Sequence, residues 1–333
     1  MSLTFSVLGK PGNDNSVFIK IDSGQNITRV LLDTGANCLY QLSRNEIAQI
    51  DHVCFSHYHM DHICGFDTVF RMIYSKPTPV HFWGPKDTIK VVYSRAMGYT
   101  WNLVQGSQCQ IFVHEITQGQ IRNVILKLEE GFSIVHEEPS TVFENNKIFV
   151  DENIEINGTI LDHKIECMAY AISETPKFNF IQSEMDALGL KPGVWCKEIK
   201  NNASGQININ GKIFDKDELR KKLLQIKYGK KLGYITDAIY NEAAKEKLIP
   251  ILKNADEVIM ECAYLDEEIA LATKHHHMTV TQVSSFARDA EIKHLNLFHV
   301  SDRYPPEVRV QFLIKAREIF PNTDYPDHWG INP

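Results

Sequence analysis

Short apolar runs rich in β-branched residues dominate the first third of the chain and predict strands joined by tight turns. Residues 17–22 and 28–33 are two such runs, and the polar residues 23–26 between them are typical of a hairpin turn. A third run, residues 52–56, leads into a dense cluster of ionisable side chains. Beyond this cluster, apolar residues recur every three to four positions from Ile63 to Phe70, which is the spacing of an amphipathic helix. We therefore expect a strand, a polar loop and a helix in this order.

The C-terminal third alternates strand-like and helix-like patterns, whereas the periodicity of residues 76–162 is too weak to assign elements. Strands are predicted at residues 232–236, 257–262 and 294–299, and helices at residues 241–253, 280–290 and 307–320. Such alternation indicates an α/β layer structure. Residues 177–231 contain turn-rich stretches at 192–193 and 201–205, and we expect this segment to form an excursion from the main body.

The composition fits a soluble globular protein. The chain has 333 residues, of which 43% are hydrophobic and 23% are charged, which supplies enough apolar material for a large core. No stretch approaches the roughly 18 apolar residues of a membrane span, and the N-terminus lacks the pattern of a secretion signal. The seven cysteines are scattered and never spaced as Cys-x-x-Cys. They fit reduced thiols in a cytoplasmic protein, and they exclude a disulfide scaffold and a thiolate zinc ribbon.

Charge is distributed unevenly along the chain. Residues 177–231 hold eleven Lys and one Arg against six acidic residues, a net of +6, so the remaining residues carry −13 of the total of −7. A basic segment on an acidic body can bind nucleic acid locally, although the whole chain does not have the charge of a general polyanion binder. A solvated lysine-rich surface explains the same charge equally well.

Residues 56–62 place four potential metal ligands within six positions: His57, His59, Asp61 and His62. His57 and His59 leave a strand end at i and i+2, so their side chains point to the same side and can hold one ion. Asp61 and His62 follow at the start of the helix and can face a second ion, so one short loop can serve two metals. Imidazole and carboxylate ligands without thiolate favour Zn²⁺ or Mn²⁺. A lone histidine would more often be structural, but this cluster favours a metal site.

Six residues cannot complete two metal sites, so further ligands must come from later strand ends. His163 could join the first ion, Asp237 could bridge both ions, and His299 could join the second. His136 competes with His163, and spacing alone does not decide between them. The histidines that lack a metal-type neighbour pattern are expected to be structural: His52, His81, His114, His294 and His328.

Another motif suggests a chemistry that its spacing excludes. Asp33-Thr34-Gly35 is similar to the active-site turn of aspartic proteases, and Asp22 begins a second acidic turn. Proteases of this kind need two carboxylates that share one proton, but the predicted hairpin would separate Asp22 and Asp33 by the length of a strand. We expect Asp33 instead to order the loops around the metal site.

With these motifs the chain resembles the tRNase Z branch of the metallo-β-lactamase fold superfamily over nearly its whole length. The segments that carry the resemblance are residues 31–62, 82–85, 162–163, 233–237, 260–263, 277–279 and 297–304 with the helix that follows. The metal motif is common to the superfamily, whereas Glu261, His277 and the Ser-x-Arg-Tyr element are more specific to this branch. The resemblance implies a four-layer αββα sandwich, formed by a single domain of residues 1–333 into which residues 177–231 are inserted as a basic protruding arm.

The resemblance also implies a role for each residue of the site. The implied ligands are His57, His59 and His163 for one zinc ion, Asp61, His62 and His299 for a second, and Asp237 as the bridge. This assignment favours His163 over His136. A hydroxide between the ions would attack phosphorus, oriented or deprotonated by Asp61, and His277, held by Glu261, would protonate the departing sugar oxygen. Without the resemblance, His277 would be interpreted as one of three exposed histidines.

The substrate implied by the resemblance is precursor tRNA, cleaved on the 3′ side of the acceptor stem by a homodimer whose arms grip the RNA. The implied substrate contacts are Arg303 and Tyr304 near the site and Pro192, Gly193, Lys197 and Lys200 in the arm. Ordinary packing is the alternative for Arg303 and Tyr304. Residues 9–15 depart from the family's substrate loop, so a small phosphodiester such as a cyclic nucleotide, or a lactone, is the alternative substrate. A non-catalytic binding module is the third interpretation, and the intact ligand set argues against it.

Overall fold

The computed structural model describes residues 2–12, 14–201 and 204–332. The chain divides into two compact units, which we call the main unit (Met1–Glu174 with Lys230–Pro333) and the inserted unit (Thr175–Gly229). The bounds of the inserted unit differ by two residues at each end from residues 177–231, the segment that was expected to leave the main body.

The first sheet of the main unit pairs its strands in chain order. They are β1 (Ser2–Leu8), β2 (Ser16–Asp22), β3 (Ile27–Leu32), β4 (His52–Cys54), β5 (Val80–Gly84), β6 (Gln110–Thr117), β7 (Gln120–Lys127) and β8 (His136–Val142). The pairs from β3 to β6 are parallel and the others are antiparallel. Parallel neighbours need crossover connections, and here these carry α1 (Arg44–Ala48), α2 (Met60–Ile63), α3 (Phe66–Ile73) and α4 (Thr88–Ala96).

The second sheet brings together strands that are distant in the sequence. Its order is β19 (Thr323–Asp324), β18 (Leu295–Phe298), β17 (Glu257–Glu261), β16 (Lys231–Ile235), β11 (Glu166–Glu174), β10 (Ile154–Asp162) and β9 (Lys147–Val150). The helices of this half are α8 (Glu242–Leu252), α9 (Ile269–His275), α10 (Val280–Asp289) and α11 (Pro306–Ile319). The strands and helices predicted in the C-terminal third agree with these bounds to within one or two residues.

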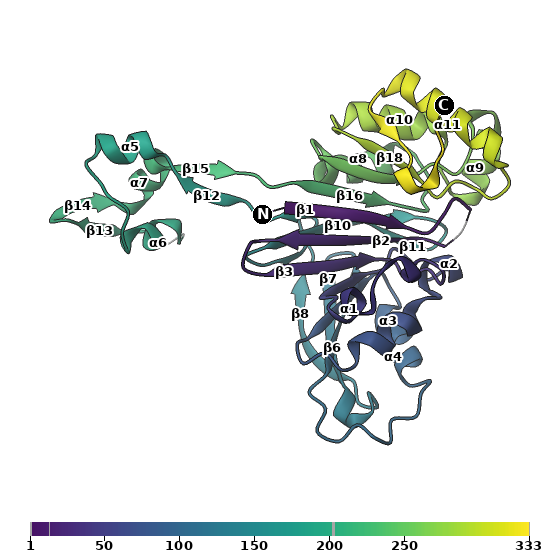
Figure 1. The fold of residues 1–333 in the computed structure, drawn as a ribbon, viewed down its shortest axis with the longest axis horizontal. Helices are drawn as coiled ribbons and strands as arrows, with labels where there is room; N and C mark the ends of the chain where they lie inside the picture. The colour runs from purple at the N-terminus through teal and green to yellow at the C-terminus, as the bar shows by residue number, and fades with distance from the viewer. Residues whose placement is uncertain (1, 13, 202–203, 333) are drawn as a thin grey trace. The chain divides into compact units, whose positions relative to one another are not determined.

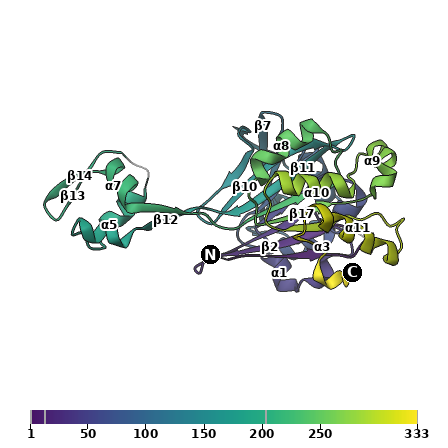
Figure 2. The ribbon, with the colours of Figure 1, turned by 90° about the horizontal axis from the view of Figure 1, so that it is seen from above.

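Three large apolar clusters among the described residues hold the main unit together and define its layers. On β2, Val17 and Ile19 belong to the cluster between the sheets, while Phe18 belongs to the cluster shared with α3 and α4. The third cluster joins the second sheet to α8, α10 and α11. Helices therefore cover the outer face of each sheet (Figure 1 and Figure 2), and the predicted αββα sandwich is confirmed. None of the helices in the described part of the chain combines the length and apolar character that a membrane crossing requires.

The inserted unit has more structure than its turn-rich sequence predicted. It contains β12 (Lys177–Phe180) paired with β15 (Leu224–Lys227), β13 (Gln206–Ile209) paired with β14 (Lys212–Asp215), α5 (Gln182–Ala187), α6 (Trp195–Lys200) and α7 (Lys216–Leu223). Its small core includes Met185, Ile199 and Leu223, which are almost fully buried. The turn expected at residues 201–205 lies partly outside the described residues. Frequent lysines obscured the few apolar positions on which this core depends.

Candidate metal centre

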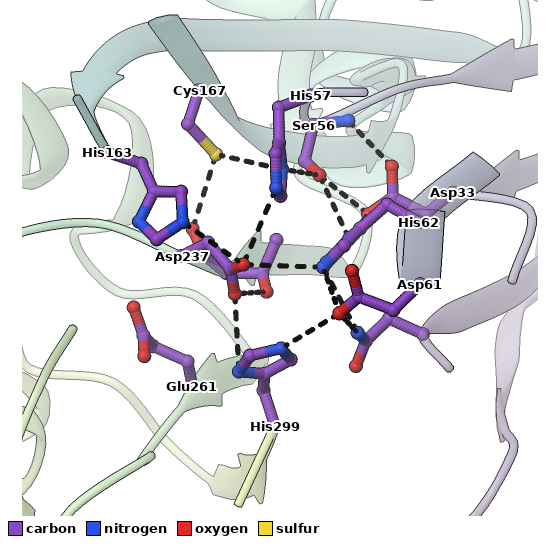
Figure 3. A network of polar contacts seen from close by, with 12 residues as sticks. Asp33, Ser56, His57, Asp61, His62, His163, Cys167, Asp237, Glu261 and His299 are labelled. Atoms are coloured by element: carbon purple, nitrogen blue, oxygen red, sulfur yellow. Dashed lines mark hydrogen bonds and ion pairs between the residues drawn. The ribbon is translucent and has the colours of Figure 1, made fainter. Parts of the chain in front are cut away.

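The ionisable side chains gather at strand ends from both sheets (Figure 3). Asp33 follows β3, Asp237 lies two residues beyond β16, and His299 follows β18. Their φ angles are 52°, 39° and 48°, in the left-handed region that residues other than glycine rarely adopt. Strained backbone of this kind is concentrated at functional sites, where the surrounding structure holds it. Each sharp bend at a strand end directs a polar side chain into the cluster drawn in Figure 3.

Three groups of potential ligands converge there, and within each group the ligand atoms lie within 4.8 Å of one another. One of them joins Asp237 and His299 to Glu261 and His277, and the other two contain the residues proposed as ligands. The first group is His57, His59, His163 and Asp237, and the second is Asp61, His62, Asp237 and His299. The structure thus brings all seven residues proposed as ligands together. His136 is not among them, because it lies on β8 with its Nε2 2.6 Å from Glu130 Oε2.

Asp237 faces both groups at once. Its Oδ2 lies 3.5 Å from His57 Nε2, 3.4 Å from His62 Nε2 and 3.6 Å from His163 Nε2. Its Oδ1 lies 3.2 Å from His299 Nδ1. Oδ2 thus faces histidines of both groups and Oδ1 faces His299 of the second group, so the carboxylate can serve as a bridging ligand.

The donor set fits transition-metal ions. His57 Nε2 and His299 Nδ1 are buried and have no hydrogen-bond partner among the described residues. An unpaired buried polar atom is costly, and coordination of a cation would remove that cost. Imidazole nitrogens combined with carboxylate oxygens suit Zn²⁺ or Mn²⁺.

The protonation states of the cluster are set by burial and by its own charges. Burial, followed by the neighbouring His62, lowers the pKa of His57 to about 2, so His57 is neutral, as a ligand must be. Burial opposes charge on Asp237, but His299 and His62 hold its pKa well below the usual range. Burial likewise opposes protonation of His62, but Asp237 and Asp33 raise its pKa well above the usual value. A cation that binds His62 must therefore displace a proton.

Asp33 orients His62 from behind the ligand groups. This fully buried carboxylate accepts hydrogen bonds from Ser56 N (2.7 Å), Ser56 Oγ (2.7 Å), His62 Nδ1 (2.8 Å) and the Tyr234 hydroxyl (2.8 Å). Because the His62 Nδ1–H donates to Asp33, its Nε2 is directed toward Asp61 and Asp237. His163 is oriented in the same way, since its Nδ1 donates to the His276 carbonyl at 2.9 Å.

The aspartic-protease interpretation is excluded by the strand register. Asp22 pairs with Ile27, whereas Val17, at the other end of β2, pairs with Leu32 beside Asp33. The glycine of the motif serves close packing instead, because a Cβ at Gly35 would lie 2.6 Å from the Asn15 backbone nitrogen.

The same close approach places Asn15, a residue that the sequence did not identify, at the metal centre. Asn15 Nδ2 donates to Asp61 Oδ2 at 3.2 Å and lies 3.1 Å from His62 Nε2. Cys167, with its Sγ 3.7 Å from His57 Nδ1, and Tyr234 were also missed. Asn15 lies in a short polar loop, and residue 13 of this loop is outside the described residues. The sequence of the loop did not mark Asn15 as a functional residue. Cys167 and Tyr234 lie within strands and carry no functional signal in the sequence, because they reach the site only through the packing of the two sheets.

His277 and Glu261 form a second polar unit beside the ligands. His277 Nδ1 donates to Glu261 Oε2 at 2.9 Å, and the fully buried Glu261 also accepts from Ala238 N at 2.7 Å. The His277 ring lies 4.9 Å from the His163 ring and 5.5 Å from the His299 ring, measured between centroids. Burial opposes protonation, but Glu261 raises the pKa of His277 to about 9. His277 therefore carries a proton near neutral pH that it can donate beside the metal centre.

The residues proposed as substrate contacts lie in two places. In the main unit, Arg303 Nη1 lies 2.9 Å from Glu268 Oε1 and stacks over the Tyr264 ring at 5.2 Å, and the largely buried Tyr304 accepts from Leu265 N at 3.2 Å. These contacts fit the packing interpretation of Tyr304, while the Arg303 side chain is 40% exposed. In the inserted unit lie Pro192, Gly193 and, on α6, Lys197 and Lys200.

Three of the histidines expected to be structural form a connected row across the first sheet. Trp83 Nε1 donates to His52 Nδ1 at 3.2 Å, and His81 Nδ1 contacts His114 Nε2 at 2.9 Å. Their neighbours are aromatic rings, and burial lowers the pKa of all three. They pack as neutral side chains.

Comparisons with known proteins agree with this geometry. A family model described as a beta-lactamase superfamily domain matches residues 28–145. The chain is 31% identical to a Ribonuclease Z of Deinococcus radiodurans, with 98% of each chain covered, and 27% identical to one of Geobacillus kaustophilus, with 96% and 92% covered. Among solved structures, the short form of human tRNase Z has a TM-score of 0.52 at 18% identity, covering 91% of this chain and 94% of that one. The metallo-beta-lactamase fold protein YhfI of Bacillus subtilis has a TM-score of 0.57 at 15% identity, with 97% and 95% covered.

Proposed function

The chain belongs to the ribonuclease Z family, and on that premise we propose that it is an endoribonuclease that removes the 3′ trailer of precursor tRNA. The observation that carries this function is the Glu261–His277 pair beside the two ligand groups. A hydrolase whose leaving group needs no proton requires only the ligand groups, which activate water. An acid poised next to them serves a leaving group that must take up a proton, such as the sugar oxygen of RNA.

We propose that the first ligand group holds one divalent ion and the second holds another, with Asp237 as the bridge and Zn²⁺ or Mn²⁺ as the ion. When bound, such ions neutralise charge on a phosphodiester and supply activated water. Burial opposes charge on Asp61, but His299 and His62 lower the pKa of its carboxyl group. Asp61 is therefore an ionised carboxylate, and its side chain is 42% exposed. We assign it the task of accepting a hydrogen bond from the attacking water.

We assign to His277 the protonation of the departing 3′ oxygen of the tRNA. Glu261 holds the imidazole by its Nδ1, so the Nε2 proton is the one available to the leaving group. Glu261 positions His277 and keeps it protonated, and it does not have to contact the substrate.

The inserted unit is proposed to grip the tRNA. It carries ten basic and six acidic side chains on an otherwise acidic chain, and lysine contacts to phosphate supply affinity without sequence preference. The resemblance adds a homodimer in which this unit acts on RNA bound at the partner's site. The cysteines, all within the described residues, are free thiols, which fits a reducing compartment such as the cytoplasm.

Cleavage of a precursor tRNA with a 3′ trailer by zinc-loaded protein tests the function. A discrete shortened product is expected, and the absence of this product, at enzyme concentrations that hydrolyse bis(4-nitrophenyl) phosphate, would reject the tRNA substrate. His277→Ala should slow tRNA cleavage by roughly 10²- to 10⁴-fold. The same variant should lose far less on the chromogenic diester, because nitrophenolate leaves without a proton. Equal losses on both substrates would reject the role of His277 as the acid.

Excision of the inserted unit tests its role separately. Ser173 on β11 pairs with Lys231 on β16, and Glu174 N donates to the Lys230 carbonyl at 3.1 Å. A two-residue Asn-Gly turn can therefore join the two strands as a hairpin. The shortened protein should lose tRNA cleavage and still hydrolyse the chromogenic diester. Retained tRNA cleavage would reject the gripping role.

A further inference from the structure

A cavity of about 730 Å³ opens beside the first ligand group, and the mechanism above does not use it. His59 lines this cavity together with Lys86, Lys90 and Lys164. Because His59 also belongs to the first ligand group, the cavity adjoins the metal centre. We call it the lysine cavity.

The lysines of this cavity are available to a ligand. All three are exposed, and their ammonium groups form no ion pair within the part of the chain that the structure describes. Two acids of the cavity are held by the backbone: Glu166 Oε2 accepts from Lys86 N at 3.3 Å, and Asp162 Oδ1 accepts from Lys164 N at 2.7 Å. The third acid, Asp87, is exposed at the cavity. Three lysines and three acids leave the lining without a formal net charge, so the ammonium groups suit separate phosphates along a strand rather than one compact polyanion.

A second cavity, of about 300 Å³, meets the other ligand group. Asp61, His277 and His299 line it. His277 lines this cavity and not the lysine cavity. On the proposed function, it protonates the 3′ oxygen of the tRNA, so the end of the mature tRNA lies in this cavity. An RNA strand whose scissile phosphate sits at the metal centre must continue away from His277, and the lysine cavity offers an opening at the first ligand group.

We propose that Lys86, Lys90 and Lys164 bind backbone phosphates of the 3′ trailer and so position the strand on the phosphate side of the scissile bond. This inference rests on the proposed function and adds a trailer-binding site to it. Lysine contacts to phosphate fix position without reading sequence, which suits a segment whose sequence differs from one precursor to another.

Substitution of each lysine by Gln tests the site. For a precursor with a long trailer, each substitution should raise KM roughly 3- to 10-fold with little change in kcat. The slope of log affinity against log salt should become less negative by about 0.7 for each phosphate of the single strand that a lysine no longer neutralises. The matched control is Lys253→Gln, because Lys253 caps α8 in an exposed pair with Glu291 at 3.2 Å and should change neither quantity.

Two comparisons make the test specific to the trailer. For a precursor with a single trailer nucleotide, the lysine variants should match the wild type, because that trailer has no backbone phosphate beyond the scissile one for the lysines to bind. Asp87→Asn should lower KM for the long trailer, since it removes a repelling charge, and Asn tolerates the left-handed backbone of residue 87, at φ 75°. Equal effects on both precursors, or none on either, would overturn the trailer site while leaving the proposed function standing. Failure of the wild type to cleave any precursor would reject the proposed function itself.

Discussion

Replacing Asp33 by Asn should release His62 and weaken one metal site. Asp33 Oδ2 accepts three of its four hydrogen bonds, from Ser56 Oγ, His62 Nδ1 and Tyr234. An Asn can keep its oxygen at that position only by turning its NH₂ group toward the Ser56 backbone N–H, 2.7 Å from the present Oδ1. The remaining bonds lose their charge assistance.

The magnitude follows from these hydrogen bonds. One broken bond that leaves a buried donor unpaired costs about 1–3 kcal/mol, and the weakening of the other three adds about 1 kcal/mol each, so the free energy of unfolding should fall by roughly 4–6 kcal/mol. Loss of the partner that orients a ligating histidine typically weakens metal binding 10- to 100-fold. Since, of the two groups proposed to hold ions, only the second contains His62, one of the two proposed ions should be affected.

Zinc titration against a competing chelator, with urea unfolding of the same protein, provides the assay. Tyr234→Phe is a milder companion, because it removes one hydrogen bond and leaves His62 paired with Asp33. Asp51→Asn is the matched control, since Asp51 also accepts from a backbone amide, Arg29 N at 2.9 Å, but lies outside the ligand groups. Unchanged affinity for both ions in a folded Asp33→Asn protein would refute the orienting role.

Three pH measurements follow from the shifted pKa values. Glu261→Gln removes the charge that raises the pKa of His277 to about 9, so the alkaline limb of the rate profile on precursor tRNA should move to lower pH, and an unmoved limb would contradict this role. Burial holds the pKa of His81 near 4 in the folded protein, against about 6.5 in the unfolded chain. The free energy of unfolding should therefore drop below pH 6.5, by about 2 kcal/mol at pH 5. In urea unfolding, His81→Phe should flatten this drop. Hydrogen bonding to Glu257 raises the pKa of His294 to about 9, so its stabilisation is complete below pH 6.5 and lost as pH rises through 9, and an identical pH dependence in His294→Gln would argue against it.

The local pattern was enough to predict the elements that surround the site. Apolar runs rich in β-branched residues predicted β2 and β3. A spacing of three to four predicted α3, because side-chain direction repeats with the backbone period within one element. The same local rule placed His57, His59, Asp61 and His62 around one loop. The inserted unit was the exception, since its few core positions are scattered among lysines.

The local sequence pattern could not decide between His136 and His163 as a metal ligand. Both histidines lie at strand ends beside acidic residues, so spacing treats them alike. The fold separates them, because His136 lies on β8 of the first sheet, whereas His163 follows β10 and faces Asp237. Family resemblance favoured His163, but no periodicity in the chain could have done so.

The sequence by itself determined which chemistry is available: imidazoles and carboxylates at fixed spacing, an acidic body and a basic insertion. Only the tertiary structure decided which of these groups meet. Tyr234 reaches Asp33 across 201 residues of chain, because the packing of two sheets sets this contact, and Asn15 reaches His62 across 47 residues. The same packing joined Lys86 and Lys164 around one cavity, which neither residue's neighbours in the chain indicate.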